Sequence, residues 1–521
     1  MPSTIPQAMR QAASQFGDCV AIAEPGGVSL SYEELQQGVR QVAGALAASG
    51  IEPGDRVAIW SPNTHHWVLA ALGSLYAGAT LVPVNTRYTG HEAFDVIART
   101  KARALFAAGP FLGVDRLQAL RNAAGQVPLP ELIVRIPVES DEPAWDDFLE
   151  RAVSDEVIDA RADAVTPDTV SDILFTSGTT GRTKGAMSAH RQALDVARAW
   201  AERAELTQAD RYLIVNPFFH SFGYKAGILA CLLTGATMIP QLVFDPGASI
   251  KLIEQARITV FPGAPTLYTS ILDHPGRAGH DLSSLRLAVT GAAVVPVALV
   301  ERMRAELTFD TVLTAYGLTE AVMATMCEAS DDNETIATTS GRAGAGMEIR
   351  IAVVPEARQA STAAGEEQVG EILLRGPNVM LGYLDDEAAT AEAIDPDGWL
   401  HTGDVGRLDE RGYLTITDRL KDMYICGGFN VYPAEIEQAL ARHPAVAESV
   451  VIGVPDDRLG EVGKAFVVRR PGAETSATEL IEFCRERLAN FKVPRQVEFT
   501  GDLPRNPAGK PLKRLLRGEA T

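Results

Sequence analysis

The residues best suited to chemistry form one run of hydroxyl and glycine residues that ends in a lysine. It reads Thr176-Ser-Gly-Thr-Thr-Gly-Arg-Thr-Lys-Gly185 and follows an apolar segment. The three glycines allow backbone N–H groups to converge on an anion, the hydroxyl groups add donors, and Lys184 adds a positive charge. We therefore predict a phosphate-binding loop made of Thr176, Ser177, Gly178, Thr179, Thr180, Gly181, Arg182, Thr183 and Lys184.

A plain surface turn is the simplest explanation for four or five Ser, Thr and Gly residues. Ten consecutive residues with a lysine and three glycines go beyond that pattern. The loop is also not of the Walker A type, because the order G-x-x-x-x-G-K-[ST] is absent. Since the chain has a net charge of -20, its overall field repels phosphate, and a phosphate ligand needs such a local cluster of donors.

Composition excludes several classes of protein. The chain has 521 residues, 46% hydrophobic and 22% charged, which is typical of a globular enzyme with several folding units. The acidic net charge argues against a nucleic-acid binder. The five scattered cysteines contain no C-x-x-C pair, and the longest uncharged apolar stretch, Ala226–Pro240, is shorter than the roughly 20 residues of a membrane-spanning helix. We predict a cytoplasmic protein with no integral membrane association and no nucleic-acid partner.

The loop must be positioned by a sheet covered by helices. Leu35, Val39, Val42 and Leu46 recur on one helical face. A strand at 56–60, a helix at 67–76 and a strand at 80–84 follow, in the alternation typical of a parallel sheet. The same alternation predicts strands at 173–176, 212–215, 259–261 and 285–290 and a helix at 191–204.

From about residue 349 the pattern changes to short strands, such as 370–375 and 412–417, with a solvated loop at 355–368. A smaller unit then has helices at 433–442 and 478–490 and strands at 449–454 and 464–469. The predicted fold class is α/β, with a large N-terminal domain of βα sheets plus a β-rich subdomain (1–420) and a small mobile α+β C-terminal domain (421–521).

Further motifs appear in order along the chain. They are Asn216-Pro-Phe-Phe-His220, Thr290-Gly-Ala-Ala293, Tyr316-Gly-Leu-Thr-Glu320, Gly398-Trp-Leu-His-Thr-Gly-Asp404, Asp418-Arg-Leu-Lys-Asp-Met-Tyr-Ile-Cys-Gly-Gly-Phe-Asn430 and Pro504-Arg-Asn-Pro-Ala-Gly-Lys510. With these motifs the chain resembles, over nearly its full length, the adenylate-forming superfamily of acyl-CoA synthetases, luciferases and peptide-synthetase adenylation domains. The nearest members are bacterial FadD-type synthetases.

This resemblance implies an ATP-dependent acid–CoA ligase that works in two steps through an acyl-adenylate. It implies ATP, Mg²⁺ and coenzyme A as substrates and cofactor, and a fatty or bulky carboxylic acid as the small-molecule partner. Some actinobacterial members activate the propanoate side chain of partly degraded steroid rings, and this chain looks similar to them. Whether the protein forms a homodimer stays open.

For ATP, the resemblance implies that Tyr316 lies against adenine, with Gly291, Ala292 and Ala293 leaving space for the base. Asp404 is suited to the ribose hydroxyls, with Arg419 as a nearby donor, and Gly317 and Thr319 complete the nucleotide site. A core tyrosine and surface charges would explain single members equally well.

The resemblance also implies four further roles in chemistry. Glu320 would hold Mg²⁺, which prefers one or two carboxylates plus phosphate oxygens. Lys510 would neutralise the acid's carboxylate and the α-phosphate while adenylate forms, because that step needs alignment and charge more than a base. Thr176 and Lys184 would hold phosphate, and His220 would lie between the acid and CoA, although a packed core histidine is the alternative.

For CoA, the family rotates its small domain about the residue matching Lys421, which presents the segment Gly427, Gly428 and Phe429. The glycines would let the pantetheine pass close to the backbone, while a tight hairpin turn explains them as well. Candidate walls of the acyl pocket are His220, Phe222, Tyr224, Val289, Gly291, Gly317 and Met323, together with Phe218. Apolar residues of this kind also occur in any core.

Two other functions stay open. One is an adenylating enzyme that passes its acyl group to a carrier protein, and the other is a non-catalytic nucleotide-binding relative. No carrier domain is evident in the sequence, and Lys510, Glu320 and the Thr/Gly loop are all present. One departure from the family pattern is Asp418, where a glycine often precedes the arginine.

Overall fold

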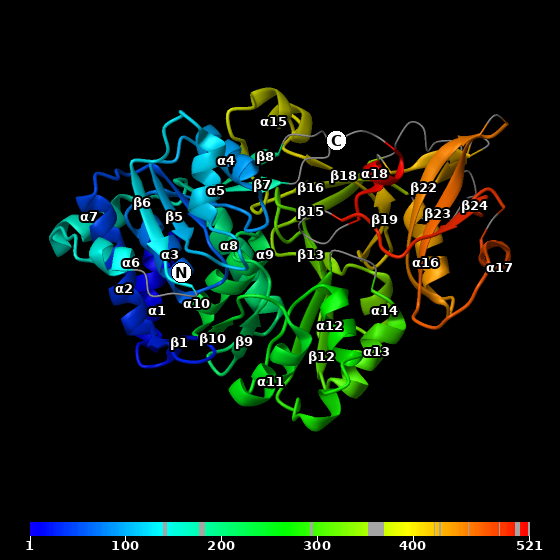
Figure 1. Ribbon diagram of the computed structural model, residues 1–521, viewed down its shortest axis with the longest axis horizontal. Helices are drawn as coiled ribbons and strands as arrows, with labels where there is room; N and C mark the ends of the chain where they lie inside the picture. Colours follow the sequence, from blue (N-terminus) through cyan, green and yellow to red (C-terminus); the bar gives the residue numbers. More distant parts are fainter. Residues whose placement is uncertain are drawn as a thin grey trace. The chain divides into compact units, whose positions relative to one another are not determined.

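The computed structural model describes residues 1–138, 143–176, 183–291, 295–352, 369–420, 422–426, 429–456, 458–488, 490–505 and 511–518. They belong to two compact units (Figure 1). The first unit comprises residues 1–347 and 375–394, and the second comprises 348–374 and 395–521. The hinge predicted at Lys421 lies outside the described residues and stays a prediction.

The first unit contains a seven-stranded sheet in the order β17-β8-β7-β4-β3-β5-β6. The five strands from β7 to β6 are parallel, and β8 and β17 extend the sheet antiparallel at one edge. Its strands are β3 (Arg56–Trp60), β4 (Thr80–Pro83), β5 (Ala104–Ala108), β6 (Leu132–Ile136), β7 (Val170–Thr176), β8 (Lys184–Ala189) and β17 (Gly382–Tyr383). The alternation predicted from the sequence is confirmed here.

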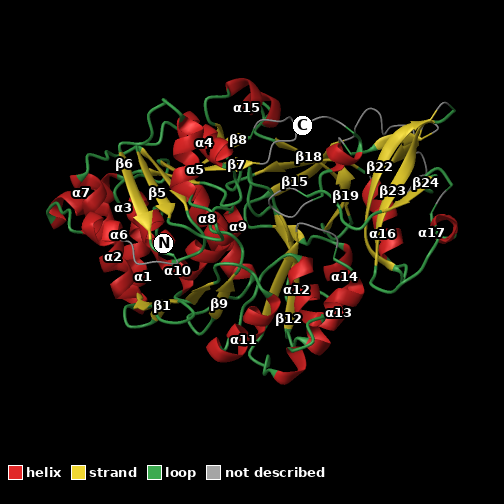
Figure 2. Ribbon diagram, in the orientation of Figure 1, coloured by secondary structure: helices red, strands yellow, loops and turns green. Residues whose placement is uncertain are grey.

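Helices cover both faces of this sheet (Figure 2). Val57 and Ile59 of β3 are buried in one core with α2 (Tyr32–Ala48) and α3 (His65–Tyr76). Ala58 and Trp60 point to the other face and pack with α4 (Gly90–Arg99) and α5 (Arg116–Ala124). Because both faces of β3 are buried, its sequence is a continuous run of apolar residues and does not alternate between apolar and polar ones.

The first unit also contains two four-stranded groups of strands. The order is β2-β1-β10-β9 and then β11-β12-β13-β14, and Val260 bridges Tyr212 to Leu287 between the two groups. The strand predicted at 259–261 is wrong in extent, because Val260 alone of the three forms β-bridges, although the Phe261 N–H also donates to the Leu287 carbonyl oxygen. The strands are β1 (Val20–Ala23), β2 (Ser29–Ser31), β9 (Arg211–Ile214), β10 (Thr237–Pro240), β11 (Leu287–Gly291), β12 (Thr311–Tyr316), β13 (Thr325–Met326) and β14 (Arg342–Ala343).

The remaining helices of the first unit are short to medium in length. They are α1 (Ile5–Phe16), α6 (Pro143–Leu149), α7 (Asp155–Ala164), α8 (His190–Arg203), α9 (Ser221–Gly223), the π-helix η1 (Tyr224–Leu229), α10 (Ala230–Thr234), α11 (Pro246–Ala256), α12 (Pro265–Leu272), the 3₁₀ turn η2 (Arg277–Gly279), α13 (Val297–Glu306), α14 (Asn333–Thr338) and α15 (Glu387–Ala393). Within the described ranges, no helix is both long and apolar enough to cross a membrane.

The second unit is rich in strands, and it combines residues 348–374 and 395–420, which the sequence assigned to the large domain, with the predicted small domain. One sheet has the order β15-β16-β18-β19, and a second consists of β21-β20-β23-β22 with β24 beside β23. The elements are β15 (Glu348–Ala352), β16 (Gly370–Arg375), β18 (Leu400–Leu408), β19 (Leu414–Arg419), β20 (Tyr424–Cys426), β21 (Phe429–Val431), α16 (Pro433–Ala441), β22 (Val446–Asp456), β23 (Gly460–Arg469), α17 (Ala477–Arg485), β24 (Gln496–Phe499) and α18 (Lys513–Leu516).

The helix predicted at 478–490 is real but ends early. It stops at Arg485, and the chain continues as a turn in which the N–H of Leu488 donates to the carbonyl oxygen of Cys484. Asn490 and Pro494 follow, and residues of these types favour turns over helix. The predicted C-terminal boundary was therefore wrong by five residues.

We expect Tyr32→Phe to lower the free energy of unfolding by about 1–3 kcal/mol, because buried acceptors lose their donor. The Tyr32 side chain is fully buried, and its hydroxyl lies 2.8 Å from the carbonyl oxygen of Cys231 and 2.7 Å from that of Ala236. Urea denaturation of both proteins measures the change. An unchanged midpoint would show that this hydroxyl contributes nothing to stability.

Candidate functional site

The antiparallel ladder between β7 and β8 holds both ends of the predicted phosphate loop. Thr176 lies directly opposite Lys184, and its Oγ1 donates to the Lys184 carbonyl oxygen at 3.4 Å. Next to Lys184, Arg99 of α4 donates to the Thr183 carbonyl oxygen at 2.7 Å. The loop residues Ser177, Gly178, Thr179, Thr180, Gly181 and Arg182 lie outside the described residues.

The edge strand β17 brings Glu320 into the same neighbourhood through Tyr383. The Tyr383 hydroxyl donates to Glu320 Oε1 at 2.8 Å, and the Met380 N–H donates to the Glu320 carbonyl oxygen at 2.7 Å. The Lys184 Nζ lies 4.9 Å from the centre of the Tyr383 ring. One tyrosine therefore contacts both the predicted phosphate lysine and the predicted metal ligand.

Tyr383 was missed by the sequence analysis. Its pairing with Ala186 of β8 follows from the sheet and not from any local motif. Burial and the charge of Glu320 raise the pKa of Tyr383 well above its ordinary value, so the hydroxyl keeps its proton and serves as a donor.

Glu320 suits a divalent cation held jointly with a ligand. Among the described residues, only Tyr383 donates to its carboxylate, and that bond occupies Oε1. Across the same ranges, no group of three or more His, Cys, Asp or Glu side chains could hold a metal alone. One available carboxylate without a protein cage fits Mg²⁺, which keeps waters and binds phosphate oxygens.

The predicted adenine residues lie at the carboxyl ends of two parallel strands, where ligands bind in α/β sheets. Gly291 ends β11 opposite Ala315, and Tyr316 ends β12 with 8% of its surface exposed. A Cβ at Gly291 would lie 2.4 Å from the Ala315 carbonyl oxygen, and one at Gly317 would lie 1.6 Å from that of Val322. Both glycines are therefore required by close backbone contact, whatever else they do.

Three other residues were predicted near this strand end. Thr319 is half-buried in the turn that follows Gly317. Ala292 and Ala293 lie outside the described residues.

His220 begins the helical segment formed by α9, η1 and α10. Its Nδ1 accepts the N–H of Phe222 at 3.2 Å, so the neutral ring carries its proton on Nε2. The side chain is accessible to water, and desolvation by the surrounding protein still lowers its pKa. A neutral imidazole with Nε2–H is a hydrogen-bond donor to an oxygen ligand rather than a base.

The other predicted acyl-pocket residues fall into two groups. Phe222 is half-buried and packs edge-on to Trp200 at 5.2 Å, beside His220. Fully or almost fully buried in the core are Phe218, Tyr224, Val289 and Met323. The Tyr224 hydroxyl has no hydrogen-bond partner within the described part of the chain, and burial with the nearby Asp172 charge raises its pKa.

In the second unit, Asp404 and Arg419 lie directly opposite each other on β18 and β19. Asp404 is 6% exposed, and its N–H donates to Thr402 Oγ1 at 3.0 Å. Asp418, the departure from the family pattern, accepts the N–H of Ala434 at 2.7 Å and so satisfies a donor in the first turn of α16.

The strands β20 and β21 pair so that Cys426 faces Phe429. Gly427, Gly428, Lys421 and Lys510 lie outside the described residues, and their predicted roles stay predictions.

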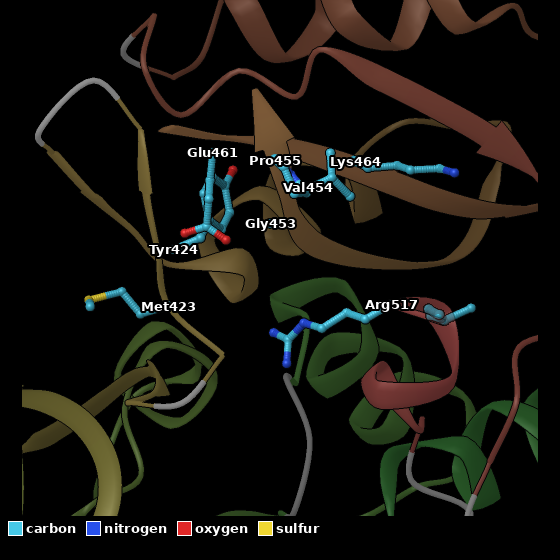
Figure 3. A pocket seen from close by; sticks show the side chains of 9 residues that line it. Met423, Tyr424, Gly453, Val454, Pro455, Glu461, Lys464 and Arg517 are labelled. Atoms are coloured by element: carbon cyan, nitrogen blue, oxygen red, sulfur yellow. The ribbon is translucent and has the colours of Figure 1, made fainter. Parts of the chain in front are cut away.

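A pocket of about 600 Å³ lies within the second unit (Figure 3). Tyr424 and Glu461 lie beside Gly453, and Arg517 is paired with Asp422 at 3.4 Å. Its lining consists of Met423, Tyr424, Gly453, Val454, Pro455, Glu461, Lys464, Leu516 and Arg517. None of the predicted site residues is among them.

Two family models match the chain. The AMP-binding enzyme model matches residues 9–384, and the model of the AMP-binding enzyme C-terminal domain matches residues 435–510.

Similar proteins cover the whole chain. A 3-[(3aS,4S,7aS)-7a-methyl-1,5-dioxo-octahydro-1H-inden-4-yl]propanoyl:CoA ligase of Rhodococcus jostii is 59% identical over 99% of both chains. A ligase of the same name from Mycobacterium tuberculosis is 58% identical over 99% of this chain and 98% of its own. The crystal structure of ATP-bound MatB from Rhodopseudomonas palustris has a TM-score of 0.87 at 31% identity and covers 99% of both chains.

We expect Tyr383→Phe to weaken Mg²⁺-dependent ATP binding about tenfold, because a hydrogen bond to a charged group contributes about 1.5–3 kcal/mol. Calorimetric titration with ATP at several Mg²⁺ concentrations measures the effect. Tyr32→Phe is the matched control and should leave the Mg²⁺ dependence unchanged. Equal Mg²⁺ dependence in Tyr383→Phe and the unaltered protein would contradict a role in orienting Glu320.

Proposed function

This chain belongs to the AMP-binding enzyme family and is an AMP-forming acid–CoA ligase, and we propose that its acid is a bicyclic, steroid-ring-derived propanoate with two ring ketones. The observation that carries this proposal is the high identity, over the full length, to two relatives whose names give the same acyl group. At this level of identity most side chains around the acid are expected to be shared.

The ligation proceeds through an acyl-adenylate. First, a carboxylate oxygen of the acid attacks the α-phosphorus of ATP, an O–P bond forms, and pyrophosphate leaves. Then the sulfur of CoA attacks the acyl carbon, a C–S bond forms, the C–O bond to AMP breaks, and the thiol proton passes to solvent.

We assign the phosphates of ATP to the end of the β7–β8 ladder. Thr176 and Lys184 lie opposite each other there and offer a hydroxyl and a cation. Glu320 would hold Mg²⁺, which supplies charge neutralisation for the phosphates when bound. Tyr383 would keep the Glu320 carboxylate in one orientation by donating to Oε1.

The remaining roles keep the assignments made from the sequence. We assign adenine to Tyr316, the ribose to Asp404 with Arg419, and the thiol path to the glycines at 427 and 428. His220 would donate from Nε2 to an oxygen of the acid, because its Nδ1 already accepts the Phe222 N–H. Lys510 would hold the acid's carboxylate and the α-phosphate.

We also place the protein in the cytoplasm. All five cysteines are free thiols and four are buried, which fits a reducing compartment.

Incubation of the protein with ATP, Mg²⁺, CoA and the dioxo-indanyl propanoate should give the matching CoA thioester by mass spectrometry. Palmitate and cinnamate, incubated in parallel, are the control acids. Turnover with the bicyclic acid should exceed turnover with either control by at least about tenfold, because a poor fit of the acyl group to its pocket reduces kcat/KM by about this factor. Preference for either control acid would overturn the proposed substrate. Accumulation of acyl-adenylate without thioester would favour a carrier protein as acceptor.

Lys510→Ala should suppress adenylate formation by at least about a hundredfold, because the transition state loses a positive charge that stabilises it. The same variant should still convert supplied acyl-adenylate and CoA to thioester. Lys513→Ala is the control, since Lys513 is paired with Glu437 at 3.1 Å. Pyrophosphate exchange and thioester formation are measured separately, and an equal loss in both would refute the assignment of Lys510.

A further inference from the structure

A fully buried ion pair includes Asp172 of β7, the strand that ends at Thr176. The Lys225 Nζ lies 2.9 Å from Asp172 Oδ1, and the two side chains are 1% and 0% exposed. Lys225 also donates to Ser188 Oγ at 2.9 Å, and Ser171 donates to the other oxygen of Asp172 at 2.7 Å. Charges are rarely buried so completely, and a charge buried in this way needs a partner of opposite sign.

On one side, this ion pair belongs to the ladder that carries Thr176 and Lys184. Asp172 lies directly opposite Ser188 on β7 and β8, and the ladder then runs without a further irregularity to the pair Thr176 and Lys184. Lys225 contacts both Asp172 and Ser188, so it ties the two strands together four positions before the loop begins.

On the other side, Lys225 belongs to the segment that begins at His220. It is the second residue of η1, a π-helix that lies between α9 and α10. π-Helical turns are rare and frequently occur at functional sites. The same segment carries His220, Phe222 and Tyr224, the predicted wall of the acyl pocket.

Lys225 is thus the point at which the predicted acid wall and the predicted phosphate strands meet. If the two side chains separated, each charge would be buried without a partner, which is strongly unfavourable. The pair therefore keeps one arrangement. A displacement of η1 on binding of the acid would therefore move the ends of β7 and β8 as well.

We propose that Lys225 and Asp172 are positioning residues that couple binding of the acid to binding of ATP. The proposal rests on the proposed function, because it takes ATP to bind at Thr176 and Lys184 and the acid to bind at His220 and Phe222. Neither residue touches a substrate; both act through the strands and the π-helix that hold those groups. Coupling of this kind is a ratio of affinities and is reciprocal between the two ligands.

The test measures that ratio in the full-length protein. The Kd for ATP is determined with Mg²⁺ by calorimetry, without and with the non-reactive alcohol analogue of the bicyclic acid. In the unaltered protein we expect the analogue to tighten ATP binding about fivefold or more, the lower end of typical coupling. Ser188→Ala, which removes only one hydrogen bond of Lys225, should reduce this factor, and the neutral double variant K225M/D172N should bring it close to one.

The double variant replaces both charges and so avoids an unpaired buried charge. A purely structural pair predicts that this variant, once folded, keeps the coupling factor. Arg277→Met is the matched control, because Arg277 is paired with Glu306 at 2.7 Å on α13, away from these strands. It should lower the melting temperature and leave the coupling factor unchanged.

Each outcome has one meaning. A coupling factor kept in a folded K225M/D172N protein, or lost equally in Arg277→Met, overturns the inference while the proposed function stands. Should K225M/D172N fail to fold, an unchanged factor in Ser188→Ala overturns it instead. Absence of any adenylation by the unaltered protein overturns the proposed function, and the inference with it.

Discussion

The antiparallel pairing of β7 with β8 is the constraint on which the rest of the site depends. The other inner strands of this sheet are parallel, and a parallel pair cannot be joined by a short loop. The reversal at β8 allows Thr176 and Lys184 to lie opposite each other at the two ends of one loop. The reversal also makes room for β17, which places Tyr383 next to Lys184 and Glu320.

The β7–β8 ladder also fixes the positions of two charged residues near the predicted phosphate site, Asp172 and Lys184. The protein carries a net charge of -20, so anionic ligands must be drawn to local cations. Asp172 lies in the strand that leads to the loop, and as an unpaired carboxylate it would add to the repulsion of phosphate. Lys225 neutralises it inside the core, where the pair is shielded from salt. Lys184 remains as a half-buried cation at the loop itself.

Several residues that looked like ligand contacts also have structural reasons to be present. Gly291 and Gly317 are fixed by carbonyl oxygens that a Cβ would strike. Asp418 satisfies a donor at the start of α16. Such residues support the local backbone whether or not they touch a ligand, so their presence alone does not show a ligand contact.

The sequence by itself determined the alternation of strands and helices and the β-rich segment after residue 349, since these depend on local periodicity. It also predicted the phosphate loop, from a run of neighbouring residues. It also indicated the family, because several short motifs occur in a fixed order. It failed at Val260, where pairing depends on strands distant in sequence, and at the end of α17, where a local turn replaces the last predicted helical residues. Only the tertiary structure revealed the contacts of Tyr383 with Glu320 and of Lys225 with Asp172, which join residues 63 and 53 positions apart, because no local pattern records which strands become neighbours.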